Sequence, residues 1–124
     1  MKILVVDDER DVQALFEQRF RKEIRENLMS FAFAFSGEEA LQYLDQKEHG
    51  AVLILSDINM PGMSGLELLK HIKTKYHTPP PAVMIMTAYG DEENYNMALN
   101  LGADDFLTKP IEFNLLKEKL NTIK

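Results

Sequence analysis

The feature that most limits the possible folds is a run of five apolar residues, 51–55, that leads through Ser56 to one carboxylate, Asp57. The run is short, and Pro61 and Gly62 break the chain soon after it, so we predict a strand buried on both faces of a parallel sheet. In open α/β sheets the functional crevice lies outside the carboxyl ends of the strands. Asp57 is therefore expected at the mouth of the sheet, although a lone aspartate there is also compatible with a solvated turn residue.

Short apolar runs recur along the chain and alternate with segments whose apolar residues have helical spacing. Besides the central run, we predict strands over 3–6, 31–35, 82–86 and 105–108. Residues 31–35 alternate Phe with Ala, a period of two that suits an edge strand. Such alternation of strands and helices implies a parallel sheet with helices on both faces and right-handed crossovers. We therefore predict an α/β, doubly wound, flavodoxin-like fold with five strands in the order 2-1-3-4-5 and five helices.

Capping residues mark the starts of the expected helices. Ser36 followed by Glu39, and Ser64 followed by Glu67, have the spacing of a capping box, and Asp91 can cap a further helix. Gly102 is expected just beyond the end of that helix. The first of the five helices should run over 12–26. Each helix is expected to turn one group of apolar residues inward, in chain order: Val12, Leu15, Phe16 and Phe20 on the first; Ala40, Leu41 and Leu44 on the second; Leu66, Leu69 and Ile72 on the third; Tyr95, Ala98 and Leu99 on the fourth; and Leu116, Leu120 and Ile123 on the fifth.

Composition excludes several classes of protein. The 124 residues are a typical length for one domain with its own core, so we treat 1–124 as a single domain. The formal net charge is -6, from 20 acidic and 14 scattered basic residues, which argues against direct binding to nucleic acid. There is no cysteine, hence no disulfide framework and no thiolate site. The apolar segment 1–6 is too short for a signal sequence or a membrane span, so a cytoplasmic protein without membrane contact is expected.

Four of the five expected strands end in residues of complementary chemistry. The first ends at Asp7 and Asp8, the third at Asp57, the fourth at Thr87 and the fifth at Lys109. Because the carboxyl ends of parallel strands meet at one edge, these side chains should share one crevice. Carboxylates about 4–6 Å apart repel each other by roughly a few kcal/mol at an effective dielectric near 20, and a cation relieves this repulsion. Oxygen ligands without Cys or His fit Mg²⁺, and a lysine opposite suits a phosphoryl group whose covalent acceptor is a carboxylate.

These residues occur, in order and on the expected elements, in four short segments: Val6-Asp7-Asp8-Glu9, Asp57-Ile-Asn-Met-Pro-Gly62, Met86-Thr87-Ala88 and Phe106-Leu-Thr-Lys109-Pro110. Over its whole length the chain resembles the receiver domains of two-component response regulators, of the chemotaxis-receiver type. The resemblance implies that Asp57 is the phospho-acceptor. The implied donor is a phosphohistidine on a sensor histidine kinase or a histidine phosphotransfer protein.

The resemblance also implies which residues bind the metal and the phosphoryl group. Asp8, Asp57 and the backbone carbonyl of Asn59 would bind Mg²⁺ directly, and Asp7 would act mostly through water. Three groups would contact the phosphoryl group: the hydroxyl of Thr87, the backbone N–H of Ala88, and Lys109, which would pair with Asp57 when the site is empty. Asn59 also borders the phosphate position, and the Lys109–Pro110 bond would be cis.

The family pattern further implies a switch and two rate-tuning positions. A loaded phosphoryl group would draw Thr87 inward, and the aromatic ring of Phe106 would turn into the vacated space. This movement would reshape the surface formed by the fourth helix, the fifth strand and the fifth helix. Phe106 stands where many receivers carry Tyr, so burial alone would have to drive the ring. Asn59 and Tyr89 would set the phosphoryl lifetime, with Tyr89 shielding the acyl phosphate from water.

Two other functions compete with the switch. A phosphatase of the haloacid dehalogenase type also has an aspartate nucleophile after a buried strand, but here Asn59 replaces the second acid and no cap segment fits the length. A pure interaction module that takes no phosphate is disfavoured by the presence of the acidic residues, Thr87 and Lys109. No output domain follows Lys124, so the chain is expected to be a stand-alone receiver or one domain of a longer protein. The cognate kinase, the downstream effector and the oligomeric state are left open.

Overall fold

In the computed structural model, which describes all residues except 47–49, 76–80, 89 and 124, five strands form one parallel sheet. Their order is β2-β1-β3-β4-β5, as predicted. All four neighbouring pairs are parallel. The strands are β1 (Lys2–Val6), β2 (Ser30–Ala34), β3 (Ala51–Asp57), β4 (Ala82–Ala88) and β5 (Asp105–Lys109).

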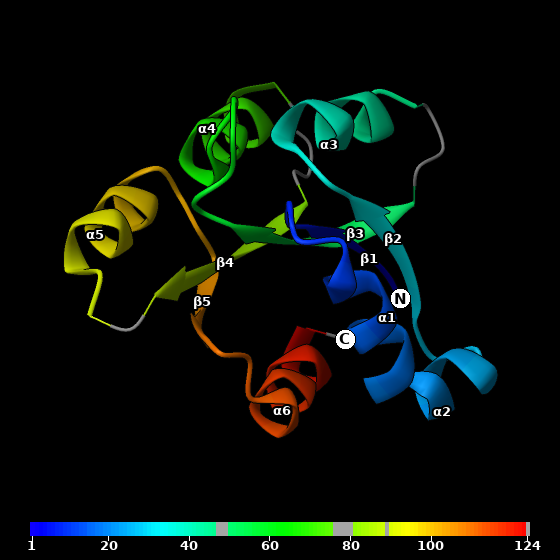
Figure 1. The fold of residues 1–124 in the computed structure, drawn as a ribbon. Helices are drawn as coiled ribbons and strands as arrows, with labels where there is room; N and C mark the ends of the chain where they lie inside the picture. Colours follow the sequence, from blue (N-terminus) through cyan, green and yellow to red (C-terminus); the bar gives the residue numbers. More distant parts are fainter. Residues whose placement is uncertain (47–49, 76–80, 89, 124) are drawn as a thin grey trace.

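Helices cover both faces of the sheet, which confirms the doubly wound α/β fold. Figure 1 shows α3, α4 and α5 on one side of the sheet and α1, α2 and α6 on the other. Among the described residues there are six helices, one more than predicted: α1 (Asp11–Arg19), α2 (Arg21–Arg25), α3 (Gly37–Leu44), α4 (Gly65–Lys75), α5 (Glu92–Asn100) and α6 (Phe113–Ile123). Within the described part of the chain, no helix has the length and apolar character needed to cross a membrane.

The additional helix arises because the expected helix 12–26 is interrupted at Phe20. The backbone of Phe20 leaves helical geometry, with φ −108° and ψ 20°. The chain still runs on, since Phe20 N–H donates to Phe16 O and Ile24 N–H donates to Phe20 O, each at 2.9 Å. The fully buried Phe20 ring packs against Phe16, Phe31 and Phe113. The interruption between α1 and α2 thus occurs at the residue whose aromatic ring is held by tertiary packing.

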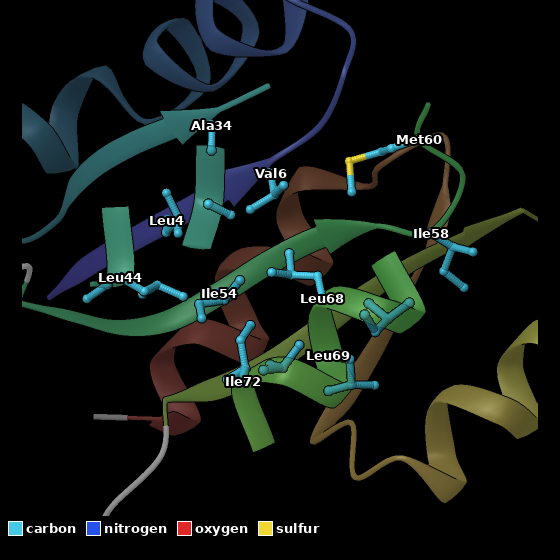
Figure 2. Packing of buried hydrophobic residues seen from close by; sticks show 14 of the residues in the cluster. Leu4, Val6, Ala34, Leu44, Ile54, Ile58, Met60, Leu68, Leu69 and Ile72 are labelled. Carbon is cyan, nitrogen blue, oxygen red and sulfur yellow. The ribbon is translucent and has the colours of Figure 1, made fainter. Parts of the chain in front are cut away.

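Each face of the sheet has its own apolar core. The core under α3, α4 and α5, part of which Figure 2 shows, contains Leu4, Val6, Ala34, Ala40, Leu44, Ile54, Leu68, Leu69, Ile72 and Ala98, among others. The core under α1 and α6 contains Ile3, Val5, Phe16, Phe20, Leu53, Leu55, Phe113, Leu116 and Leu120, among others. Burial on both faces fixes the register of β1 and β3, because a shift by one residue would exchange the two sets of side chains. The strand ends, and the polar residues on them, are thereby fixed in place.

The predicted inner faces hold for α3 and α6 but not for α5, and on α1 the prediction fails for Leu15, which is 38% exposed. Only Ala98 of α5 is buried, whereas Tyr95 is 41% exposed and Leu99 is 52% exposed. The prediction for Tyr95 and Leu99 was therefore wrong: α5 carries apolar residues around most of its circumference, so spacing alone did not show which side meets the sheet. On α4, Leu68 is buried in addition to the expected Leu69 and Ile72. Ile123 belongs to the residues whose side chains are not described.

The predicted caps are present. Ser36 Oγ accepts from Glu39 N–H at 3.0 Å, and Ser64 Oγ accepts from Glu67 N–H at 3.2 Å. In the first box Glu39 reaches back one residue further than expected, since its carboxylate accepts from Phe35 N–H at 3.3 Å. Asp91 caps α5, and Gly102 has a φ of 97° just beyond its end. These caps set where α3, α4 and α5 begin beside the carboxyl edge of the sheet.

Candidate functional site

The carboxyl edge of the sheet carries a cluster of three carboxylates. Asp7 and Asp8 follow β1, and Asp57 is the last residue of β3, the neighbour of β1. One carboxylate oxygen of each residue lies within 4.8 Å of those of the other two. Asp7 is 2% exposed and Asp57 is 9% exposed, whereas Asp8 faces solvent. Two buried acids therefore lie beside one accessible acid.

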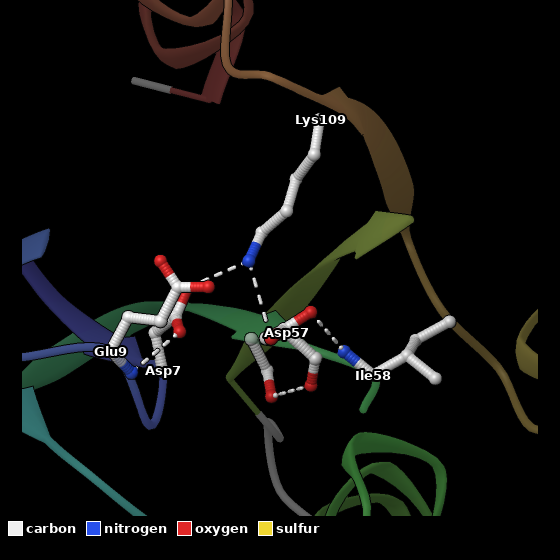
Figure 3. A network of polar contacts seen from close by, with 6 residues as sticks. Asp7, Glu9, Asp57, Ile58 and Lys109 are labelled. Carbon is white, nitrogen blue, oxygen red and sulfur yellow. Dashed lines mark hydrogen bonds and ion pairs between the residues drawn. The ribbon is translucent and has the colours of Figure 1, made fainter. Parts of the chain in front are cut away.

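Lys109, at the end of β5, reaches both buried carboxylates. Its ammonium Nζ donates to Asp7 Oδ2 at 3.0 Å and lies 3.2 Å from Asp57 Oδ2 (Figure 3). The resemblance implied a pair with Asp57, and the structure adds Asp7 as the closer partner. The Lys109–Pro110 peptide bond is cis, as the resemblance implied. One cation thus lies against two buried anions.

Backbone N–H groups hold the second oxygen of each buried carboxylate. Ile58 N–H donates to Asp57 Oδ1 at 2.9 Å, and Glu9 N–H donates to Asp7 Oδ1 at 3.0 Å (Figure 3). Both donors belong to the chain that leaves the strand. The strand ends themselves therefore orient the two carboxylates, and the Oδ2 atom of each is turned toward Lys109.

Burial and charge shift the pKa values of this site. Burial raises the pKa of Asp57 above the ordinary aspartate value; the charge of Lys109 opposes this rise and the charge of Asp7 adds to it. Burial alone would lower the pKa of Lys109, but its bonds and charge interactions with Asp7 and Asp57 outweigh burial and raise it. The lysine therefore remains a cation, and an additional positive charge near Asp57 would favour its ionised form.

The strand β4 brings Thr87 and Ala88 to the same edge. Where β3 pairs with β4, Asp57 lies beside Met86, so Thr87 is the next residue outward. On β5, Thr108 pairs with Thr87 and Lys109 pairs with Ala88. Thr87 is buried and Ala88 is exposed. Because β4 lies between β3 and β5, Thr87 and Ala88 lie between the strand ends that carry Asp57 and Lys109.

Comparison with known proteins identifies the family. The family model described as "response regulator receiver domain" matches residues 3–121, which is nearly the whole chain. The chain is a response regulator receiver domain. The match includes all the strand ends described above and confirms the family resemblance.

Sequence relatives of this receiver include regulatory proteins about twice its length. It is 35% identical over 122 residues to the transcriptional regulatory protein CpxR of Klebsiella pneumoniae, a match that covers 98% of this chain and 48% of the relative. It is 32% identical over 123 residues to the two-component response regulator PhoP of Pseudomonas aeruginosa, covering 99% of this chain and 51% of the relative. The chain thus spans about half the length of these relatives.

Solved structures share the receiver fold. A response regulator receiver protein from Pseudomonas putida superposes with a TM-score of 0.83 at 26% identity, covering 98% of this chain and 95% of that one. A second structure is the complex of the Saccharomyces cerevisiae histidine phosphotransfer signaling protein Ypd1 with the receiver domain of its downstream response regulator Ssk1. That match has a TM-score of 0.82 at 29% identity and covers 96% of this chain and 85% of the other.

The donor set of the receiver fits Mg²⁺. Asp7, Asp8 and Asp57 offer only carboxylate oxygens, which Mg²⁺ prefers, and none of the sulfur or imidazole ligands typical of Zn²⁺. The exposed Asp8 leaves one side of the cluster open to solvent, and Mg²⁺ usually retains several waters. Burial and the charge of Asp7 both disfavour the ionised form of Asp57, so a cation would be stabilising here. The residues present therefore fit the ion that the family implies.

Of the remaining residues considered for the site, the structure describes Asn59 and Glu9. Asn59 lies in the loop after β3 with an exposed side chain. Tyr89, predicted to tune the phosphoryl lifetime, lies outside the described residues. Glu9 is exposed and contributes its backbone N–H to Asp7. Asn59 therefore remains a predicted metal ligand, through its backbone carbonyl, and a predicted tuning residue.

The predicted switch residue, Phe106, lies beneath an aromatic neighbour. Phe106 is half-buried on β5 and packs against the core under α4 and α5. The centroid of its ring lies 4.3 Å from that of Tyr95 on α5, with 41° between the ring planes. Tyr95 also lines an open hollow of about 360 Å³ together with Thr87 and Thr108. Sequence reasoning missed Tyr95 as a neighbour of the switch because it assigned that side chain to the inner face of α5.

Proposed function

We propose that this receiver accepts a phosphoryl group on Asp57 from a phosphohistidine, and that the acceptance alters the surface formed by α5, β5 and α6. The observation that supports this most is the combination of the carboxylates of Asp7, Asp8 and Asp57 with the Lys109 ammonium at one edge of the sheet. A buried acid with a raised pKa beside a cation is typical of a reactive carboxylate.

In the proposed reaction, a carboxylate oxygen of Asp57 attacks the phosphorus of the donor. An O–P bond forms, the P–N bond to the imidazole breaks, and the released histidine keeps the bonding electron pair and takes up a proton. Asp8, Asp57 and the backbone carbonyl of Asn59 would hold Mg²⁺, with Asp7 acting through water. When bound, Mg²⁺ supplies positive charge that offsets the repulsion between the carboxylates and the phosphoryl oxygens.

The other site residues would bind the transferred group. Lys109 would exchange its contact with Asp57 for one with a phosphoryl oxygen while it stays near Asp7. The hydroxyl of Thr87 and the backbone N–H of Ala88 would donate to other phosphoryl oxygens, with Asn59 at the border of the phosphate position. The location of Thr87 and Ala88 on β4, between β3 and β5, supports their assignment as phosphate-binding residues. Such charge-assisted hydrogen bonds are about twice as strong as neutral ones.

A groove beside the site suits the docking of a phosphohistidine-bearing protein. It has a volume of about 550 Å³ and includes Asp7 and Lys109 in its wall. The rest of the wall is mostly apolar and comes from α1 and from the segment after β5: Val12, Leu15, Ile111 and Phe113, with Glu9 and Arg19 at its polar positions. The proposed partner is a sensor histidine kinase or a histidine phosphotransfer protein, a class that the Ypd1 complex exemplifies for another receiver. The proposal retains the cytoplasmic location expected from the sequence.

The proposed output is a rearrangement around Phe106. Inward movement of Thr87 toward a phosphoryl group would open space beside it, and the Phe106 ring would leave Tyr95 to fill that space. Exposed apolar side chains on α5 and α6, namely Tyr95, Met97, Leu99 and Leu115, give this surface the character of a contact area for an effector or an output domain. Asn59 and Tyr89 remain the proposed tuning positions, and Tyr89→Ala should release phosphate faster.

The test is incubation of the chain with acetyl phosphate and Mg²⁺, followed by mass spectrometry. We expect one phosphoryl group per molecule, an adduct stable enough to isolate, and no adduct on Asp57→Asn or in the presence of a magnesium chelator. Asp91→Asn, at an acid that caps α5, is the matched control and should label normally. Rapid continuous release of phosphate would instead indicate a phosphatase. Absence of labelling on the unaltered chain would indicate an interaction module and contradict the proposal.

A further inference from the structure

The first residue of α3 lies directly against the loop that follows the proposed acceptor. Gly37 is buried, and a Cβ added to it would lie 2.9 Å from each of three Met63 atoms, Cβ, Cγ and Sδ. Cβ atoms in proteins essentially never approach another heavy atom closer than 3.0 Å. Met63 therefore occupies space that any side chain at position 37 would need.

A change of rotamer at Met63 would not relieve this contact. The Met63 Cβ is as close to Gly37 as the sulfur is, and a Cβ is fixed to its backbone. A side chain at position 37 would therefore displace the backbone of the loop 58–64. The preceding loop residue also lies beside α3, since a Cβ on Gly62, whose φ is 75°, would lie 2.9 Å from Glu38 Oε2, although that oxygen ends a flexible side chain and could move away. Two consecutive loop residues thus lie against the first turn of α3.

The other parts of the loop are fixed to the acceptor strand and to the core. Gly65 N–H donates to Ile58 O at 2.7 Å, and a Cβ on Gly65 would overlap the backbone oxygen of Asp57. Met60 is 8% exposed and belongs to the core under α3 and α4, where Figure 2 shows it at the end of the cluster. Asn59 lies between these fixed points. The contact of Met63 with Gly37 is a further point that holds this short loop, so a displacement at Met63 would be passed along the loop toward the Asn59 backbone.

We infer that Gly37 is a positioning residue for the magnesium site, acting through Met63 on the backbone carbonyl of Asn59. The inference rests on the proposed function, in which that carbonyl is a Mg²⁺ ligand. Gly37 has no side chain and touches neither metal nor phosphate. Its contribution is to let α3 and the loop approach closely, which keeps the Asn59 carbonyl in place. The position of this carbonyl matters because Mg²⁺ demands near-ideal octahedral geometry and tolerates displaced ligands poorly.

A purely structural role for Gly37 predicts a different outcome. If the close approach serves packing alone, the clash with Met63 would lower the Tm of Gly37→Ala despite the higher helix propensity of alanine, and magnesium binding would be unchanged. A positioning role predicts weaker magnesium binding by the same variant. The two interpretations therefore differ in magnesium affinity, which can be measured separately from thermal stability.

The experiment measures the magnesium dissociation constant of the full chain by titration calorimetry, and its Tm, for a set of four variants. Gly37→Ala should bind Mg²⁺ about tenfold more weakly than the unaltered chain, the size of effect typical for residues that orient metal ligands. Met63→Ala removes two of the three contacting atoms, so the double variant should bind Mg²⁺ more tightly than Gly37→Ala. Gln42→Ala, on the exposed side of α3, is the control and should bind normally.

The outcomes separate the inference from the proposed function. If the unaltered chain binds Mg²⁺ and Gly37→Ala binds it equally well, the inference is wrong and the proposed function stands. If the unaltered chain binds no Mg²⁺, the proposed function fails and the inference fails with it. Should Gly37→Ala not fold, Met63→Ala alone decides: it removes the Cγ and Sδ that lie beside Gly37, loosens the loop against α3 and should weaken magnesium binding measurably. Unchanged binding in a folded Met63→Ala would overturn the inference.

Discussion

The Lys109 ammonium lies 3.0 Å from Asp7 Oδ2, closer than its 3.2 Å to Asp57 Oδ2. Asp7 is almost completely buried, whereas the Lys109 side chain is 29% exposed. A buried carboxylate without a cation bears its desolvation cost uncompensated. Lys109 therefore stabilises the folded site before any phosphoryl group arrives, in addition to its proposed contact with phosphate.

Lys109→Met should lower the free energy of unfolding substantially when Mg²⁺ is absent. The substitution keeps most of the aliphatic chain but leaves Asp7 and Asp57 without their cation. Removal of one partner from a buried ion pair costs about 3–5 kcal/mol, and the partial exposure of Lys109 places the expected loss at the lower end of that range. Urea unfolding with a magnesium chelator present measures it.

Two controls accompany Lys109→Met. Lys75→Met removes the partner of an exposed pair with Asp45 and should change stability by less than about 1 kcal/mol. The double variant Lys109→Met with Asp7→Asn should regain part of the lost stability, because the buried charge is gone. A Lys109→Met chain as stable as the unaltered protein would show that Asp7 does not depend on this lysine.

Asp57→Asn should raise stability near neutral pH in the absence of Mg²⁺. Because the pKa of Asp57 is raised, the folded state holds its proton to a higher pH than the unfolded state does. Stability is therefore lost as pH rises from the ordinary aspartate pKa through the raised one. Asparagine does not titrate, so the variant escapes this loss, and a gain of about 1 kcal/mol would raise Tm by roughly 4 °C.

The pH dependence provides the check on Asp57→Asn. The difference in Tm between the variant and the unaltered chain should be largest near pH 7.5 and should shrink toward pH 4, as falling pH increases the fraction of folded protein in which Asp57 is protonated. Addition of Mg²⁺ at pH 7.5 should narrow the difference by stabilising the unaltered chain alone. A difference in Tm that is constant between these pH values would indicate that the gain has another cause.

Leu15→Glu should impair phosphoryl transfer from a protein donor without affecting transfer from a small-molecule donor. Leu15 is 38% exposed on α1 and lines the groove that contains Asp7 and Lys109. A charge there would impair docking of a phosphohistidine-bearing protein, and loss of a buried apolar contact at an interface typically costs about 1–2 kcal/mol or more, which is roughly tenfold in affinity. Labelling by acetyl phosphate should remain unchanged. An equal loss of labelling with the protein donor and with acetyl phosphate would indicate damage to the site itself.

The fold was largely predictable because its determinants are local. The apolar runs that become β1, β3 and β4 are short and bounded by turn residues, and the capping boxes at Ser36 and Ser64 mark helix starts. The break at Phe20 was not predictable, because it accompanies the packing of that ring against Phe16 and against two rings from distant segments, Phe31 and Phe113. The orientation of α5 was not predictable either, since several of its sides carry apolar residues.

The candidate site was predictable to the level of residues but not of pairings. A parallel sheet brings all strand ends to one edge, so the assembly of Asp7, Asp57 and Lys109 follows from topology. Whether Lys109 lies nearer to Asp7 or Asp57 depends on differences of a fraction of an ångström in side-chain position. The contact of Gly37 with Met63 was hidden for a similar reason, because nothing local to either residue indicates that α3 and the loop approach so closely.

Phe106 should leave Tyr95 when the site is loaded with a phosphoryl mimic. Its ring centroid lies 4.3 Å from that of Tyr95, so each ring shifts the NMR signals of the other. Beryllium fluoride with Mg²⁺ should therefore change the Tyr95 ring signals, and Phe106→Ala should abolish most of that change. Tyr43, which lies on α3, serves as the internal control and should keep its signals. Because Phe106 has no hydroxyl that could form a hydrogen bond, the driving force for its movement has to be burial of the ring. Unchanged Tyr95 signals on loading, with the mimic shown to be bound, would contradict a switch at Phe106.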